Sequence, residues 1–287
     1  MKIVIFGVGL IGGSFALALK QVKLAKKIVG VSRTQASIQS ALDLGAIDAI
    51  GAADAATLSD ADLVLLAMPV GQMGEVMARI APHLSNQTII TDAGSTKQDV
   101  VALAYQHLGA CIAHFVPAHP IAGGEVSGVS AAHTDLYRHK KVVITPLKEN
   151  AATTVEKVRA IWQACGAEVR EMPAAQHDAV FAAVSHLPHL LAYALVHDIA
   201  NRPDAELMFD FAAGGFRDFT RIAGSHPEMW RDISLANRDA LLREIDTYMS
   251  EVSALRKMVE QRDAEALEKL FEFARDARSA WLAKLKS

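Results

Sequence analysis

Four short segments place side chains that can do chemistry inside an otherwise apolar chain. They are Asp92–Lys97 and His119–Glu125, which each follow a predicted strand, Ser185–His189, within an apolar stretch, and Gly214–Arg221, with two arginines beside glycines and phenylalanines. Histidine suits proton transfer because its ordinary pKa lies near neutrality, and a guanidinium pairs with a carboxylate through two hydrogen bonds. These residue types could take a proton from a hydroxyl group and hold an acidic substrate.

A glycine-rich turn close to the N-terminus predicts a second kind of chemistry. Gly7, Gly9 and Gly12 form a GxGxxG pattern directly after an apolar strand, and the pattern opens a helix. The first glycine allows a tight turn, the second lets the backbone approach a pyrophosphate, and the third allows close helix–strand packing. Leu10 and Ile11 complete the turn, and we expect all five residues to bind a dinucleotide. A glycine-rich turn without a ligand is the alternative.

The residues after the second predicted strand indicate which dinucleotide binds. An acidic residue there would bind the ribose 2′-hydroxyl of NAD, but this chain has Ser32, Arg33 and Thr34. The two hydroxyls can donate hydrogen bonds and Arg33 can pair with a 2′-phosphate, so NADP is favoured over NAD. A solvated loop arginine is the alternative. After the fourth strand, Met68 and Pro69 could wall the nicotinamide, although core packing explains Met68 equally well.

The elements that must position these segments alternate between strand and helix in the first half of the chain. The predicted strands are short, rich in Val, Ile and Leu, and mostly continuous, as expected for strands buried on both faces. They are Lys2–Phe6, Ile28–Val31, Leu63–Ala67, Thr88–Thr91, Cys111–Val116 and Lys141–Thr145, with helices such as Gly12–Gln21 and Gln35–Leu44 between them. This alternation predicts an α/β fold with a Rossmann-type, doubly wound parallel sheet.

The second half of the chain is predicted to be helical. Asn150 could cap a helix that ends near Gly166, and Ser225–Glu228 has the pattern of a capping box with a proline in the first turn. Apolar residues from Leu241 to Val259 recur every three or four positions, which favours helix packing across a dimer interface. A last helix is predicted over Asp263–Lys284.

Two domains follow from this change of pattern. We expect a dinucleotide-binding Rossmann domain at residues 1–147 and an all-helical substrate-binding and dimerisation domain at residues 148–287. We see no regulatory extension, so any small-molecule inhibitor would have to act at the active site.

Composition excludes several other classes of protein. The chain has 287 residues and a formal net charge of -3, without a basic face that would fit a nucleic-acid backbone. Two isolated cysteines, Cys111 and Cys165, indicate a reducing compartment, and we expect a cytoplasmic protein without a metal site. Glycines interrupt residues 1–19, which argues against a secretory signal. Residues 178–198 could span a bilayer by length, but a helix in a core or subunit interface explains them better.

Three segments together resemble the signature segments of the prephenate/arogenate (cyclohexadienyl) dehydrogenase family. They are His119–Gly123, Ser185–His189 and Gly215–Ala223, and the segments Gly7–Gly12 and Asp92–Lys97 also fit the family pattern. The resemblance extends over nearly the whole chain and includes the domain order. Three separate motifs in the right order are much more specific than a GxGxxG pattern alone.

The resemblance implies a role for each residue of the reacting centre. On pattern alone, His119 is more often a packing residue than a base, but it matches the family's catalytic histidine, which takes the proton of the ring hydroxyl. Ser95 matches a serine that orients that hydroxyl and the nicotinamide. Arg221 matches the arginine that anchors a substrate carboxylate, and His189 matches a histidine that meets the substrate side chain.

Other matches concern the rim of the site. Glu125 and Asp218 match acidic residues of an ionic gate with the arginine, and Trp230 matches an aromatic residue that lines the pocket, either from its own chain or from the partner subunit. Alternatives remain for two of the site residues, because Glu125 could be a solvated loop acid and Arg221 could form only a helix-end salt bridge with Asp218. We expect His186 to be structural.

The implied reaction is the oxidative decarboxylation of prephenate, or arogenate, to 4-hydroxyphenylpyruvate, or tyrosine, with hydride transfer to NADP or NAD. The His189 position favours prephenate or dual use. Many members of the family have an acidic residue where this chain has Ser32, Arg33 and Thr34, which puts NAD in doubt but not the chemistry. The resemblance also implies a homodimer.

Two other functions would be compatible with parts of the pattern. A 3-hydroxyacid-type dehydrogenase has the same order of domains but uses a lysine of the helical domain as its acid or base, and no lysine lies between Pro173 and Arg256. A non-catalytic NADP-binding sensor or scaffold would keep the glycine turn and Arg33, but would have no need of His119, Ser95 and Arg221 together.

Overall fold

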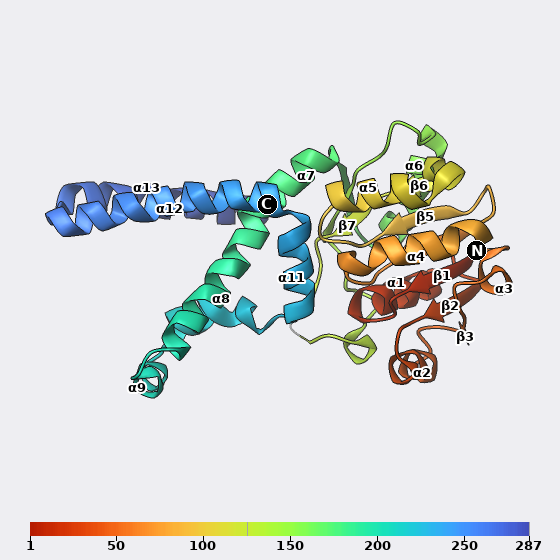
Figure 1. Ribbon diagram of the computed structural model, residues 1–287, viewed down its shortest axis with the longest axis horizontal. Helices are drawn as coiled ribbons and strands as arrows, with labels where there is room; N and C mark the ends of the chain where they lie inside the picture. The colour runs from red at the N-terminus through yellow and green to blue at the C-terminus, as the bar shows by residue number, and fades with distance from the viewer. Residues whose placement is uncertain (125, 287) are drawn as a thin grey trace. The chain divides into compact units, whose positions relative to one another are not determined.

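A six-stranded parallel sheet forms the centre of the N-terminal part of the protein (Figure 1). The computed structural model describes residues 1–124 and 126–286. The strand order β3-β2-β1-β4-β5-β6, with every neighbouring pair parallel, is that of a dinucleotide-binding fold and confirms the predicted doubly wound sheet. The strands are β1 (Lys2–Phe6), β2 (Lys27–Val31), β3 (Ala49–Ile50), β4 (Leu63–Leu66), β5 (Ile89–Asp92) and β6 (Phe115–Val116).

Helices cover both faces of this sheet because successive strand side chains point to opposite sides. Ile3 and Ile5 of β1 belong to one core cluster, which also contains residues of α1 (Leu10–Gln21), α2 (Gln35–Asp43) and α6 (Ala152–Ala164). Val4 and Phe6 belong to the other cluster, with residues of the remaining helices of this region. Those helices are α3 (Ala55–Leu58), α4 (Met73–Ile80) and α5 (Gln98–His107).

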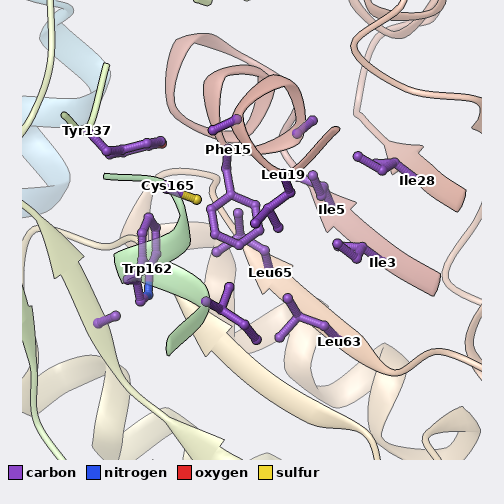
Figure 2. Packing of buried hydrophobic residues seen from close by; sticks show 14 of the residues in the cluster. Ile3, Ile5, Phe15, Leu19, Ile28, Leu63, Leu65, Tyr137, Trp162 and Cys165 are labelled. Carbon is purple, nitrogen blue, oxygen red and sulfur yellow. The ribbon is translucent and has the colours of Figure 1, made fainter. Parts of the chain in front are cut away.

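Aromatic rings from α1 and α6, which are far apart in the sequence, pack together in the first core cluster. Phe15 of α1 and Trp162 of α6 meet edge to face with ring centroids 4.8 Å apart, and Tyr137 meets the same indole at 5.3 Å (Figure 2). Cys165 lies beside them, where burial raises the pKa of its thiol to about 12. Residues 148–171 thus pack into the core of the N-terminal sheet, and the predicted domain boundary near residue 147 stays a prediction.

A second, three-stranded sheet corrects the predicted strand positions. It has the order β7 (Ala118–Pro120), β8 (Lys141–Ile144) and β9 (Glu168–Glu171), with β7 antiparallel and β9 parallel to β8. The strand predicted at Lys141–Thr145 therefore exists but lies outside the main sheet. The strand predicted over Cys111–Val116 was mostly wrong, because Gly109–His114 is a 3₁₀ helix and only Phe115–Val116 pairs.

A chain of helices follows β9. It begins with α7 (Ala174–Phe181), a π-helical turn at Ala182–His186 and α8 (Leu187–Ala200), which form one continuous helical segment. Pro188 follows the π turn, and the wider turn accommodates a residue that lacks a backbone N–H. The next elements are α9 (Ala205–Asp210), α10 (Gly214–Thr220), a 3₁₀ helix at Arg221–Gly224 and α11 (Pro227–Ala236).

The segment Ala174–Ala200 is long and apolar enough to cross a membrane by length and composition alone. Within the described chain, only 28% of the most apolar 18-residue stretch of this segment is buried. Packing in the core of one subunit therefore explains only part of its apolar composition. A subunit interface stays our prediction for the remainder.

Two predicted helix caps were wrong. The helix α6 begins at Ala152 with Ala151 as its cap, whereas Asn150 accepts a hydrogen bond from the N–H of Leu147 and donates to the carbonyls of Ala113 and Phe115. For α11 the cap is His226, not Ser225, and Pro227 occupies the first turn as predicted. At both helix starts, the residue that was expected to cap the helix makes a contact with a distant segment of the chain instead. The local sequence cannot reveal such a contact.

The chain divides after Arg238 into two compact units, and the second consists of two long helices. These are α12 (Arg238–Gln261) and α13 (Ala264–Lys286), and the side chain of Asp263 caps the second by accepting from the N–H of Ala266 at 3.0 Å. Large apolar side chains stay exposed on both helices, among them Val259 and Phe273, which are 63% and 77% exposed. Such surfaces are typical of helices that pack against another subunit.

Candidate active site

The glycine turn after β1 has the geometry of a phosphate cradle. Gly7 has φ +90°, and a Cβ atom there would lie 2.6 Å from the carbonyl oxygen of Ala67. At Gly12 a Cβ atom would lie 2.2 Å from the oxygen of Gly7, so both positions need glycine. Gly9 is different, because a Cβ atom there would meet nothing within 4 Å. Gly9 also caps α1, so open space lies over a helix N-terminus, where a pyrophosphate fits.

A cavity of about 630 Å³ extends from this turn along the ends of β2 and β4. Its lining contains six of the predicted cofactor residues, namely Gly7, Gly9, Ser32, Arg33, Met68 and Pro69. The amide nitrogen of Gln72, also in the lining, is buried without a hydrogen-bond partner among the described residues. An unsatisfied buried donor in a cavity of this shape fits a polar ligand such as a dinucleotide.

Four other predicted cofactor residues do not line the cavity. Gly12 packs against Gly7, and the carbonyl of Ile11 accepts a 2.6 Å hydrogen bond from the hydroxyl of Tyr137. Leu10 packs against the first core cluster. Thr34 caps α2, and its hydroxyl donates to Ser37 at 2.7 Å.

The cavity lining also contains residues that the sequence did not single out. Arg79 near the end of α4 and Ser37 and Ser40 of α2 all contribute, and among the described lining residues none is a carboxylate. Arg33 is held by an exposed ion pair, in which its guanidinium lies 3.5 Å from the carboxylate of Glu228. Nothing in the local sequence around Arg79 distinguishes it from a solvated helix arginine, so only the tertiary structure reveals it.

The predicted catalytic histidine lies within a strand. His119 is the middle residue of β7 and pairs with Val143, although it was expected just beyond a strand end. Its neighbour Ala118 is held on both sides, since its N–H donates to Asp92 at 2.9 Å and its carbonyl accepts from the ammonium of Lys97 at 2.7 Å. Asp92 and Lys97 form a fully buried ion pair with each other. The Asp92–Lys97 segment thus fixes the backbone that carries His119.

Three residues that the sequence analysis missed are linked to His119, two of them by direct contact. The Nδ1 atom of His119 is 2.8 Å from Nε2 of His177, and the Nδ1 atom of His177 is 2.8 Å from the carboxylate of Asp178. Phe181 packs its ring edge to face with His119 at 4.9 Å. Burial lowers the pKa of His119 well below 6.5, and the positive charge of Lys97 acts in the same direction, as would a positive charge on His177 or His186. His119 is therefore neutral at neutral pH and can accept a proton.

A second group of predicted residues gathers on α8 and α11. His189 stacks on the indole of Trp230 of the same chain, with centroids 3.7 Å apart and planes 20° apart. Its Nδ1 atom lies 2.8 Å from the carbonyl of Ser185, which leaves Nε2 for a ligand. Burial lowers the pKa of His189, and the positive charge of Arg221 lowers it further, which indicates that the guanidinium lies nearby.

The remaining predicted site residues have different surroundings. Asp218 is exposed, and its ion pair is with Arg217 at 3.8 Å. Ser95 is half-buried in the loop between β5 and α5. Glu125 lies outside the described residues. His186 is buried and lies 3.1 Å from the side-chain amide of Asn237, and burial lowers its pKa to about 4, which fits a structural role.

Comparison with known proteins covers nearly the whole chain. Residues 15–171 match the prephenate dehydrogenase nucleotide-binding domain, and residues 173–273 match the prephenate dehydrogenase dimerization domain. The chain belongs to the prephenate dehydrogenase family.

Individual members of the family match this chain over nearly all of its length. The prephenate dehydrogenase of Bacillus subtilis is 39% identical over 96% of this chain and 75% of its own length. The cyclohexadienyl dehydrogenase of Zymomonas mobilis is 35% identical over 97% of this chain and 95% of its own. The crystal structure of the A. aeolicus prephenate dehydrogenase with hydroxyphenyl propionate and NAD+ has a TM-score of 0.88 and 37% identity, covering 97% and 96% of the two chains.

Membership in the prephenate dehydrogenase family confirms several predictions and decides between others. The fold class, the family resemblance and the assignment as a nicotinamide-dependent dehydrogenase of tyrosine biosynthesis are confirmed. A sensor without catalytic activity and a 3-hydroxyacid-type dehydrogenase are thereby set aside. The cofactor is a nicotinamide dinucleotide, and the individual site residues stay predictions.

Proposed function

We propose that the protein oxidises and decarboxylates prephenate to 4-hydroxyphenylpyruvate, with arogenate, which yields tyrosine, as a second substrate. The observation that carries this proposal is the arrangement of His119, a neutral histidine held by the buried Asp92–Lys97 pair at the same sheet edge as the dinucleotide cavity. A neutral imidazole is the form that a general base requires.

His119 takes the proton of the ring hydroxyl in this proposal, and Ser95 orients that hydroxyl. As the O–H bond breaks, hydride leaves C4 of the ring, and the bond between the ring and its carboxylate breaks to release CO2. The nicotinamide, when bound, accepts the hydride. Aromatisation makes the step effectively irreversible, so the residues of the site mainly need to position the substrate.

Substrate recognition is assigned to the second group. Arg221 would pair with a carboxylate of prephenate, and Nε2 is the nitrogen of His189 that would face the substrate side chain, because Nδ1 donates to the carbonyl of Ser185. We assign Trp230 to the site of its own chain, since it stacks on His189. Asp218 and Glu125 are proposed to gate the approach to Arg221.

The preferred cofactor is proposed to be NADP. Arg33 and Arg79 both line the dinucleotide cavity, and no carboxylate is found among the described lining residues to bind a ribose 2′-hydroxyl. Two guanidiniums favour a 2′-phosphate instead. NAD is the second cofactor in this proposal.

We further propose a cytoplasmic homodimer of two-domain subunits, with the helical part joining the subunits. Exposed apolar side chains on α12 and α13 and the match to a dimerization domain support the dimer, and two buried free cysteines fit a reducing compartment. Tyrosine, which keeps the phenol and a carboxylate of the reacting molecule, would compete with prephenate for Arg221. Sedimentation should give the mass of two chains, and tyrosine inhibition noncompetitive with prephenate would contradict the proposed binding place.

The experiment that tests the function measures NADPH and NADH formation by the purified protein with prephenate and arogenate offered separately. We expect the fastest reduction with prephenate and NADP. A preference for NAD would overturn the cofactor assignment alone. Reduction in none of the four combinations would overturn the catalytic assignment.

A further inference from the structure

A chain of hydrogen bonds leads from His119 into the interior of the protein. The ring of His177 bridges His119 and Asp178, with 2.8 Å on each side. His177 and Asp178 both come from α7, and His177 is 58 residues away from His119 in sequence. His177 is 0% exposed and Asp178 is 1% exposed, so water does not compete for these bonds.

Asp178 is held in its ionised form by the start of another helix. Its two carboxylate oxygens accept the backbone N–H groups of Lys97 at 2.8 Å and Gln98 at 2.9 Å, where α5 begins. Burial opposes ionisation, yet the hydrogen bonds from His177, Gln98 and Lys97 together lower the pKa of Asp178. An ionised carboxylate can only accept hydrogen bonds.

This fixes the proton positions along the chain of bonds. Because the Asp178 carboxylate only accepts, Nδ1 of His177 must carry a hydrogen. Burial lowers the pKa of His177, so the ring is neutral and its Nε2 has a lone pair. Nδ1 of His119 must then donate to it. In neutral His119 the remaining nitrogen, Nε2, therefore carries the lone pair that can take a proton.

We propose that His177 and Asp178 are positioning residues of the dehydrogenase, which hold His119 in the tautomer that accepts the substrate proton and stabilise the imidazolium that then forms. The inference rests on the proposed role of His119 as the base. The proton moves from the substrate hydroxyl to Nε2 of His119 and no further, since Asp178 stays ionised throughout.

Other charged groups face the same pair of rings and must be included in any pH argument. Lys97 and Asp92 form their own buried ion pair beside β7, and His186 lies on the π turn that follows α7. Asp99 on α5 interacts with the charge of Asp178, and burial raises the pKa of the Asp99 carboxyl. Since the charges of Lys97 and Asp92 cancel, the Asp178 carboxylate is the anion that stabilises a positive charge on the two histidines.

Three variants test the proposal through the pH dependence of kcat with prephenate. Asp178→Asn can present its amide N–H to His177, which would reverse both tautomers, and we expect kcat to fall by about 10²- to 10⁴-fold. The acidic limb of the profile should also move to lower pH, because an anion facing the histidines is lost. His177→Phe removes the acceptor for His119, while the side-chain carbonyl of His177→Gln can accept in its place and should restore part of kcat.

The matched control is Tyr193→Phe, which loosens the same continuous helical segment without touching the two rings. The hydroxyl of Tyr193 donates to the main-chain carbonyl of Ser225 at 2.6 Å. This variant should unfold more readily and leave the acidic limb unmoved. If Asp178→Asn lowers kcat without moving the acidic limb, as the control would, the residue is merely structural and the proposal is overturned. Unchanged kcat in both Asp178→Asn and His177→Phe would overturn it as well.

The tautomer itself can be read without substrate. In the full-length protein with ¹⁵N-labelled histidine, nitrogen-15 spectra should show His119 protonated at Nδ1 and unprotonated at Nε2 at neutral pH, with His119→Asn used to assign the signals. The opposite tautomer would overturn the proposal. Because this measurement does not depend on turnover, it also separates a failure of the inference from a failure of the proposed substrate.

Discussion

The dinucleotide cavity lies at the ends of β2 and β4, whereas the histidine cluster is held beside the end of β5 by Asp92 and Lys97, and the two are built in different ways. Four of the predicted residues that line the cavity, Gly7, Gly9, Ser32 and Arg33, come from the first two strand ends, and Arg33 remains exposed to solvent. The cluster joins His119 to His177, 58 residues away in sequence, and joins His177 to Asp178, and both His177 and Asp178 are buried. Solvent-exposed charge pairs contribute little energy, whereas buried ones are costly to break. Substitutions in the cluster should therefore have the larger effects.

The largest effect is expected for His119→Asn. The asparagine cannot take a proton at neutral pH, so kcat should fall by about 10²- to 10⁴-fold, which is the usual contribution of a general base. Cofactor affinity, measured by fluorescence titration with NADPH, should stay within about twofold because the variant leaves the cavity lining intact. A kcat near that of the unaltered protein would refute the assignment of His119.

A large loss of stability is expected for Lys97→Met. The variant leaves Asp92 charged and unpaired at 0% exposure, and breaking a buried pair in this way costs about 3–5 kcal/mol. Urea denaturation at neutral pH measures the loss. The double variant Asp92→Asn/Lys97→Met has no unpaired charge and should recover part of the stability. Equal losses in the single and double variants would contradict this explanation.

Stability should also fall as the pH falls from about 6.5 to 4. His186 has an ordinary pKa near 6.5 when unfolded and about 4 when folded, so over this range the unfolded chain binds a proton that the folded protein does not. The lowered pKa values of His119, His177 and His189 act in the same direction.

The loss from His186 alone is on the order of 3 kcal/mol at pH 4, because each unit of pKa shift corresponds to about 1.4 kcal/mol. Urea denaturation at pH 7 and pH 4.5 measures it, and His186→Gln should flatten the dependence. An unfolding free energy that does not change between the two pH values would argue against buried neutral histidines.

The smallest effects are expected at the dinucleotide cavity. Arg33→Ala and Arg79→Ala should each lower kcat/KM for NADP by about 10-fold, as expected for loss of an exposed charge-assisted hydrogen bond, and should change kcat/KM for NAD little. Glu228→Gln releases Arg33 from its 3.5 Å ion pair and should raise the preference for NADP by about twofold. Equal losses with both cofactors in Arg33→Ala would mean that Arg33 does not contact the 2′-phosphate.

The sequence determined those parts of the protein that depend on neighbours along the chain. Continuous apolar runs identified the strands β1, β2, β4 and β5 within one residue of their observed ends, since strands buried on both faces have no polar alternation. Glycine spacing predicted the turn at Gly7–Gly12, because only glycine fits its backbone geometry and contacts. The motifs around His119, His189 and Arg221 predicted the family, which the comparisons confirm.

The tertiary structure decided what depends on residues distant in sequence. The separate sheet that contains β7 and β8, and hence the place of His119 within a strand, follows from pairing with β9 and from the bonds of Asp92 and Lys97 to Ala118. His177 and Asp178 look like ordinary residues of an apolar helix until α7 lies against the start of α5. A hydrogen bond depends on position in space to within a few tenths of an ångström, and local spacing carries no information about a partner 58 or 81 residues away.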